Sequence, residues 1–74
     1  MKVYERNDYL NFAYPDDMKR ILDYLNIRGE ILVKPSTIES LYYDFSDERY
    51  SASWLYVDEQ ILEEFEEWLT EKDI

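Results

Sequence analysis

The chain has 74 residues, of which 46% are hydrophobic and 18% aromatic, and its net charge at pH 7 is −10. This length fits a single domain, residues 1–74, and the apolar content is too high for a disordered acidic tail. The absence of cysteine and histidine excludes disulfides, Cys/His zinc sites and catalytic triads. We expect a cytoplasmic protein, because no run approaches the ~18 apolar residues of a membrane span and the first residues lack a secretory signal.

The first third of the chain predicts short strands followed by a helix. Residues 1–14 alternate loosely between polar and apolar side chains, which is typical of one or two short strands. Pro15 followed by two aspartates predicts a helix start, because proline suits the first turn and acids suit the positive helix end. Arg28 and Gly29 predict the end of this helix. Its apolar stripe comprises Met18, Ile21, Leu22 and Leu25.

The middle of the chain predicts a strand and a second helix. The apolar run 31–33 is typical of a strand, which Pro35 would end. Ser36 and Glu39 match a capping box, in which each side chain bonds to the other residue's backbone amide. We expect the helix to end near residues 46–47. Its apolar stripe comprises Ile38, Leu41, Tyr42 and Phe45.

The last third predicts a strand and an acidic helix. Residues 50–57 alternate in the manner of a strand, and Asp58 suits the N-cap of the last helix. We therefore expect an α+β fold in which three helices pack on a two- to three-stranded antiparallel sheet. A winged-helix shape used for protein contact is the alternative; the second helix carries acids without lysine or arginine, which disfavours DNA reading. The apolar stripe of the last helix comprises Ile61, Leu62, Phe65, Trp68 and Leu69.

The negative charge is concentrated in the second part of the chain. Residues 1–43 are nearly neutral, whereas residues 44–74 carry eleven acids and only Arg49 and Lys72. Direct binding to nucleic acid or to an anionic membrane is therefore not expected, because affinity for phosphates comes from lysine and arginine. A basic protein is the partner that this charge favours.

The last helix places most of these acids on one predicted face. It holds eight acids over about 24 Å of axis, or roughly one per 3 Å. The pairs Glu59–Glu63 and Glu63–Glu67 set like charges four residues apart, which costs helix stability. We predict that the face binds a partner, and a merely solvated face is the alternative. The acids are Asp58, Glu59, Glu63, Glu64, Glu66, Glu67, Glu71 and Asp73.

Aromatic residues supply further candidate contacts. The chain has 8 tyrosines and 2 tryptophans, residue types that dominate protein-binding hot spots. Adjacent Tyr42 and Tyr43 cannot both face one core, so one should lie outside. We predict that Tyr43, Tyr24 and Tyr50 contact the partner. The larger rings expected in the core are Trp54, Phe65 and Trp68.

The sequence does not favour catalysis or a metal site. Residues 44–48 gather acids but lack the residue order of an EF-hand, so a helix-ending turn is the preferred interpretation. Paired carboxylates are guaranteed by the composition, and no glycine-rich phosphate loop is present. We expect no enzyme activity, no cofactor and no bound metal.

In size and charge, the chain resembles the small acidic proteins that phages and mobile elements use against host defences. These include nucleic-acid-mimicking anti-restriction and anti-CRISPR proteins. The acids of 44–73 and the surplus of aromatic residues carry the resemblance, which matches no family motif and transfers no residue role. It implies a competitive inhibitor whose acidic helix occupies a groove meant for DNA or RNA. The alternative is a homodimeric or adaptor module that binds through aromatic and apolar surface and is acidic for solubility.

Overall fold

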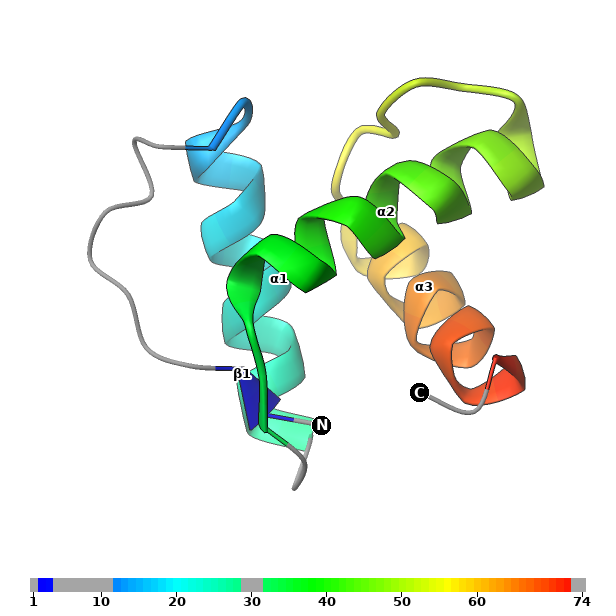
Figure 1. The fold of residues 1–74 in the computed structure, drawn as a ribbon. Helices are drawn as coiled ribbons and strands as arrows, with labels where there is room; N and C mark the ends of the chain where they lie inside the picture. Colours follow the sequence, from blue (N-terminus) through cyan, green and yellow to red (C-terminus); the bar gives the residue numbers. More distant parts are fainter. Residues whose placement is uncertain (1, 4–11, 29–31, 73–74) are drawn as a thin grey trace.

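A computed structural model describes residues 2–3, 12–28 and 32–72. Three helices dominate these residues: α1 (Pro15–Arg28), α2 (Pro35–Tyr50) and α3 (Glu59–Glu71). Figure 1 shows α2 crossing between α1 and α3, so that all three helices surround one core. The buried apolar residues are Met18, Ile21, Leu22, Leu25, Ile38, Tyr42, Phe45, Val57, Leu62, Phe65, Trp68 and Leu69.

The predicted α+β fold with an antiparallel sheet is wrong, because the described fold is all-α. The strand pairing within the described residues is limited to β1 (Lys2–Val3) and β2 (Leu32–Val33). These two-residue strands run parallel, with Lys2 opposite Leu32 and Val3 opposite Val33. They bring the segments that precede and follow α1 side by side. They are too short to form a sheet layer that helices could cover. Residues 12–14, the end of the predicted strand region 1–14, form bends and not a strand. The other predicted strand residues, 1, 4–11 and 31, lie outside the described residues.

Helix α1 confirms its prediction at both the start and the buried face. It begins at Pro15, and two aspartates occupy its first turn, where the helix dipole favours them. All four residues of the predicted stripe are buried. The helix includes Arg28, and the predicted glycine cap lies outside the described residues.

The start of α2 differs from the predicted capping box. Lys34 is the N-cap, with no side-chain cap bond, and Pro35 is the first helical residue. Proline fixes the backbone angle that a helix start needs, so Pro35 begins this helix rather than merely ending a strand. The Ser36 side chain therefore lies inside the first turn. The Glu39 carboxylate instead accepts a hydrogen bond from the Ala13 amide at 3.3 Å.

The end of α2 also differs, because the helix continues through the predicted turn to Tyr50. The hydroxyl of Ser46 donates to the carbonyl of Tyr42 at 2.8 Å. This bond satisfies the serine inside the helix, so the residue does not end it. Ser46 is fully buried, and the acids that follow it remain on helical backbone.

The predicted strand 50–57 is wrong: Tyr50 ends α2, and residues 51–57 are an irregular connection with bends. Ser51 adopts a left-handed conformation (φ 53°, ψ 38°) that turns the chain away from α2. The Leu55 amide donates to Ser46 Oγ at 3.2 Å, and the Tyr42 hydroxyl donates to the Leu55 carbonyl at 3.0 Å. Burial raises the pKa of Tyr42 above its usual range, which keeps this donor protonated. The described segment therefore forms no wing of a winged helix.

Helix α3 confirms its predicted cap and its apolar face. The Ile61 amide donates to Asp58 Oδ1 at 2.9 Å, as expected for an N-cap. Four of the five predicted stripe residues are buried, and Ile61 packs against the core at its edge. Trp54, predicted as a core residue, is only partly buried.

Replacing the cap of α3 is expected to destabilise the protein measurably. Asp58→Ala removes the acceptor for the Ile61 amide and should cost about 1 kcal/mol of unfolding free energy. For a domain of this size, the melting temperature should fall by about 4–8 °C. Thermal denaturation followed by circular dichroism measures the change. Asp58→Asn keeps the acceptor and should recover most of the loss, and an equal loss for both variants would contradict the cap.

Candidate protein-binding surface

Three of the predicted acidic residues of α3 are engaged with the other helices. The Tyr24 hydroxyl donates to Glu66 at 3.3 Å, which links α3 to α1. The Tyr50 hydroxyl donates to Glu64, and Arg49 pairs with Glu71, so both contacts link α3 to α2. These acids flank the apolar stripe of α3, and each contacts a residue of another helix. Asp58 is also engaged, as the N-cap.

The remaining acids form a row on the outer side of α3. We call Glu59, Glu63 and Glu67 the outer acidic row; all three are exposed, and they lie one helical turn apart. Within the described residues, their carboxylates make no hydrogen bond or ion pair. Successive members advance by about 6 Å along the axis, so the row spans about 12 Å. Asp73 lies outside the described residues.

The outer acidic row is a source of uncompensated negative potential. Like charges four residues apart destabilise a helix by about 0.2–0.5 kcal/mol per pair. The cations nearest the C-terminal part of α3 form ion pairs with other acids: Arg49 pairs with Glu71, and Lys72 pairs with Glu48 at 3.2 Å. Of the eight predicted acids, three form this row, four have another contact within the chain, and Asp73 lies outside the described residues.

The three predicted tyrosines are dispersed and do not form one surface. Tyr43 is half-buried, with its ring edge against Trp54 at 4.9 Å between centroids. Tyr24 is half-buried beside Glu66, whereas Tyr50 is 45% exposed. The hydrogen bond to Glu64 raises the pKa of Tyr50. As predicted, one member of the Tyr42 and Tyr43 pair is buried and the other is not.

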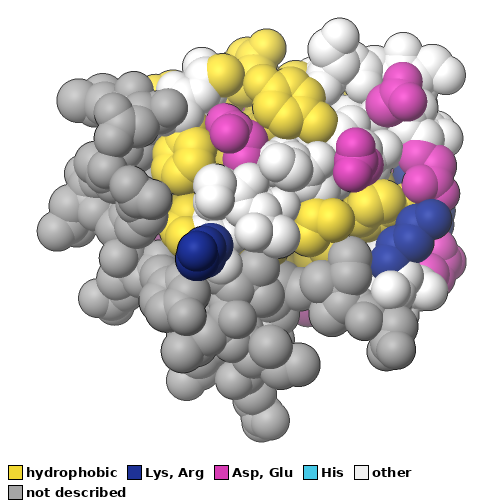
Figure 2. Space-filling view, viewed as in Figure 1, with side chains coloured by type: hydrophobic (Ala, Val, Ile, Leu, Met, Phe, Trp, Pro, Cys, Tyr) yellow, Lys and Arg dark blue, Asp and Glu magenta, His cyan; other side chains and the backbone are white. Residues whose placement is uncertain are grey.

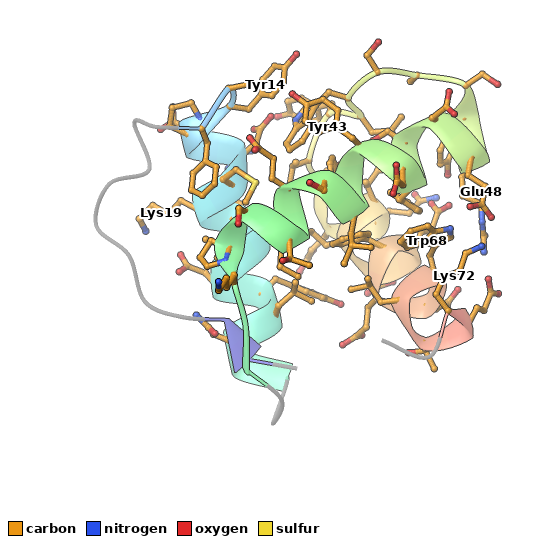
Figure 3. The ribbon with its side chains drawn as sticks, viewed as in Figure 1. Tyr14, Lys19, Tyr43, Glu48, Trp68 and Lys72 are labelled. Atoms are coloured by element: carbon orange, nitrogen blue, oxygen red, sulfur yellow. The ribbon has the colours of Figure 1, made fainter. Side chains whose placement is uncertain are left out.

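An aromatic cluster that sequence reasoning missed lies where α1 and α2 approach each other. Tyr14 stacks on Trp54, with centroids 4.6 Å apart and planes 13° apart, and Tyr43 completes the cluster. Trp54 Nε1 donates to Asp17 at 2.9 Å, which fixes the indole. Figure 3 shows Tyr14 and Tyr43 at the same end of the molecule. Tyr14 is 41% exposed, so the aromatic cluster offers contact area to solvent.

A groove between α2 and α3 is the second feature that the sequence did not reveal. It encloses about 550 Å³, and acids of α2 form one rim. The same acids were predicted to lie in a turn, which is wrong because α2 runs through them. Figure 2 shows acidic side chains beside a strip of apolar side chains. Basic side chains lie at the right of that view, the side on which Figure 3 labels Lys72. The lining residues are Leu41, Asp44, Asp47, Glu48, Trp68 and Lys72.

Other kinds of site find no support in the described residues. In these ranges, no group of three or more acids is arranged to hold a metal ion. No helix of the described part has the length and apolarity needed to cross a membrane. No protein-family model, curated protein or solved structure matches the chain. The surface features that bear on function are the outer acidic row, the aromatic cluster and the groove.

Proposed function

We propose that the protein is an inhibitor that mimics nucleic acid and occupies a basic groove of a DNA- or RNA-binding protein. The observation that carries the proposal is the outer acidic row, because Glu59, Glu63 and Glu67 are exposed and have no cationic partner among the described residues. Like-charge pairs cost helix stability. A partner that supplies lysine or arginine removes this cost on binding.

The geometry of α3 suits this role. An advance of about 6 Å between carboxylates is close to the ~6.8 Å between every second phosphate of one strand, at ~3.4 Å per phosphate. The helix is held by the Asp58 cap and by the contacts of Glu64, Glu66 and Glu71, so the row is presented on an ordered support. A preorganised row of charges loses little conformational entropy on binding and speeds association with an oppositely charged groove.

Competition with nucleic acid tests the proposal. The chain is immobilised and exposed to the heparin-binding proteins of a bacterial lysate. Each captured protein is then purified and mixed with labelled duplex DNA to form a complex. Adding the chain should release the DNA competitively. The affinity of the chain for the captured protein should fall steeply between about 50 and 200 mM salt, as the affinity of nucleic acid does. A captured protein that binds the chain and DNA together, or binding that is indifferent to salt, would contradict the proposal.

The aromatic cluster favours a second candidate function. Tyr14 stacks on Trp54, Tyr43 meets the same indole edge-on, and Tyr56, two residues after Trp54, is 72% exposed. Such rings are typical of apolar interaction surfaces, including those of small homodimers and adaptors. Binding that persists at high salt and is lost on Tyr14→Ser would support this function instead.

A further inference from the structure

The groove between α2 and α3 contains a buried hydrogen-bond donor without a partner. Trp68 is only 3% exposed, and its Nε1 makes no hydrogen bond with any described residue. The pKa of the nearby Glu48 carboxyl is lowered chiefly by its hydrogen bond with Lys72, and Trp68 adds to this lowering. The Trp68 N–H and the Glu48 carboxylate nevertheless do not meet the geometry of a hydrogen bond. A buried N–H that lacks an acceptor is unfavourable, so a ligand that supplies one gains affinity there.

The groove is lined by three acids, Asp44, Asp47 and Glu48, and by one cation, Lys72. Glu48 has a cationic partner, since Lys72 Nζ lies 3.2 Å from it. Asp44 and Asp47 line the same groove, are exposed, and form no ion pair within the described ranges. They stand three residues apart on α2, so their side chains are neighbours on one helix face. Two adjacent carboxylates suit a planar guanidinium, whose donors form a fork.

Lys72 already occupies the position that an external cation would take. Its Nζ lies over the Trp68 ring, 5.5 Å from the centroid, while it pairs with Glu48. Figure 3 shows Glu48, Trp68 and Lys72 gathered at one side of the molecule. Lys72 and Glu48 are both exposed, and an exposed ion pair contributes little to stability, so it opens at small cost. Arginine stacks on tryptophan more often than lysine does.

We infer that the groove receives an arginine side chain from the partner, with an adjacent backbone carbonyl that accepts from Trp68 Nε1. The guanidinium displaces Lys72 from the Trp68 ring and binds Asp44 and Asp47. This inference rests on the proposed function for the partner's basic character, and it names the chemistry of one anchor. The anchor lies apart from the outer acidic row, because it is built from α2 and the last turns of α3.

The test uses N-acetyl-arginine-N-methylamide, which carries a guanidinium and backbone-like carbonyls, as the probe. The two indole N–H signals of the ¹⁵N-labelled protein report binding. The Trp68 signal should shift and saturate, whereas the Trp54 signal should stay, because its N–H is already bonded to Asp17 at 2.9 Å. Lys72→Gln removes the internal occupant and should strengthen binding of the probe by about threefold.

Matched variants separate the groove from general charge effects. Lys19→Gln makes the same charge change at another exposed ion pair, with Asp23, and should leave probe affinity unchanged. Asp44→Asn combined with Asp47→Asn should weaken binding of the probe by about tenfold. A Trp68 signal that stays still in both the natural chain and Lys72→Gln, or that shifts equally with N-acetyl-norleucine-N-methylamide, overturns the inference. If the chain fails to compete with DNA while the Trp68 signal still responds to the probe, the proposed function is contradicted and the groove inference is not.

Discussion

Replacing Phe65 with alanine is expected to unfold most of the protein at room temperature. Phe65 is fully buried at the centre of the aromatic core, and its ring contacts Tyr42 at 5.1 Å, Phe45 at 5.3 Å and Trp68 at 6.1 Å between centroids. Truncating a buried phenylalanine costs about 3–5 kcal/mol. A single core in a chain of this length rarely supplies more than about 3–5 kcal/mol in total.

Urea denaturation followed by far-ultraviolet circular dichroism measures this effect. Phe65→Leu keeps most of the apolar volume and should remain folded with reduced stability. Tyr56→Ala removes an aromatic ring that is 72% exposed and should change the unfolding free energy by less than about 0.5 kcal/mol. A cooperative transition for Phe65→Ala within error of the natural chain would show that these three helices do not meet at Phe65.

The three helices could be predicted because their apolar residues repeat with helical spacing. The stripe at Met18, Ile21, Leu22 and Leu25 requires only the chain's local sequence, and every member is buried. The cap at Asp58 is equally local, since it acts three residues ahead. Signals of this kind depend on neighbours within a turn or two, so a sequence shows them directly.

The sheet was predicted wrongly because alternation describes side chains and not backbone partners. Residues 50–57 alternate as a strand would, but the backbone of Leu55 bonds to the hydroxyls of Ser46 and Tyr42. These hydroxyls lie on α2 and replace a neighbouring strand. Ser46 also suggested a turn, and only the burial of its hydroxyl against the Tyr42 carbonyl explains why the helix continues.

The sequence predicted which acidic residues belong to the candidate site, but not which of them contact other helices. Sequence reasoning placed Glu64, Glu66 and Glu71 in one class with the outer acidic row, although each contacts another helix. Their partners stand 14, 42 and 22 residues away, so tertiary structure decides which glutamates have a partner within the chain. The stacking of Tyr14 on Trp54 and the groove at Trp68 also depend on contacts distant in sequence.

Neutralising the outer acidic row should weaken partner binding without unfolding the protein. The triple variant Glu59→Gln, Glu63→Gln and Glu67→Gln removes two like-charge pairs, which should stabilise the helix by about 0.4–1 kcal/mol. Glu59 stands in the first turn of α3, where the helix dipole favours an acid by about 0.3–1 kcal/mol, so the unfolding free energy should change by less than about 1 kcal/mol. Loss of three exposed charge contacts should raise the dissociation constant for a captured nucleic-acid-binding protein by about 10- to 100-fold. Weaker binding at nearly unchanged stability excludes unfolding as its cause.

A second triple variant isolates the position of the charge from its amount. Ser36→Lys, Thr37→Lys and Ser40→Lys lie on the exposed side of α2 and change the net charge by the same amount as the three glutamine substitutions. If the partner responds to the row on α3, this variant should retain affinity within about threefold, since distant exposed charges are largely screened at physiological salt. Calorimetric titration at two salt concentrations measures both variants. Equal losses would mean that the partner senses only overall charge, and unchanged binding of the glutamine variant would remove the row from the interface.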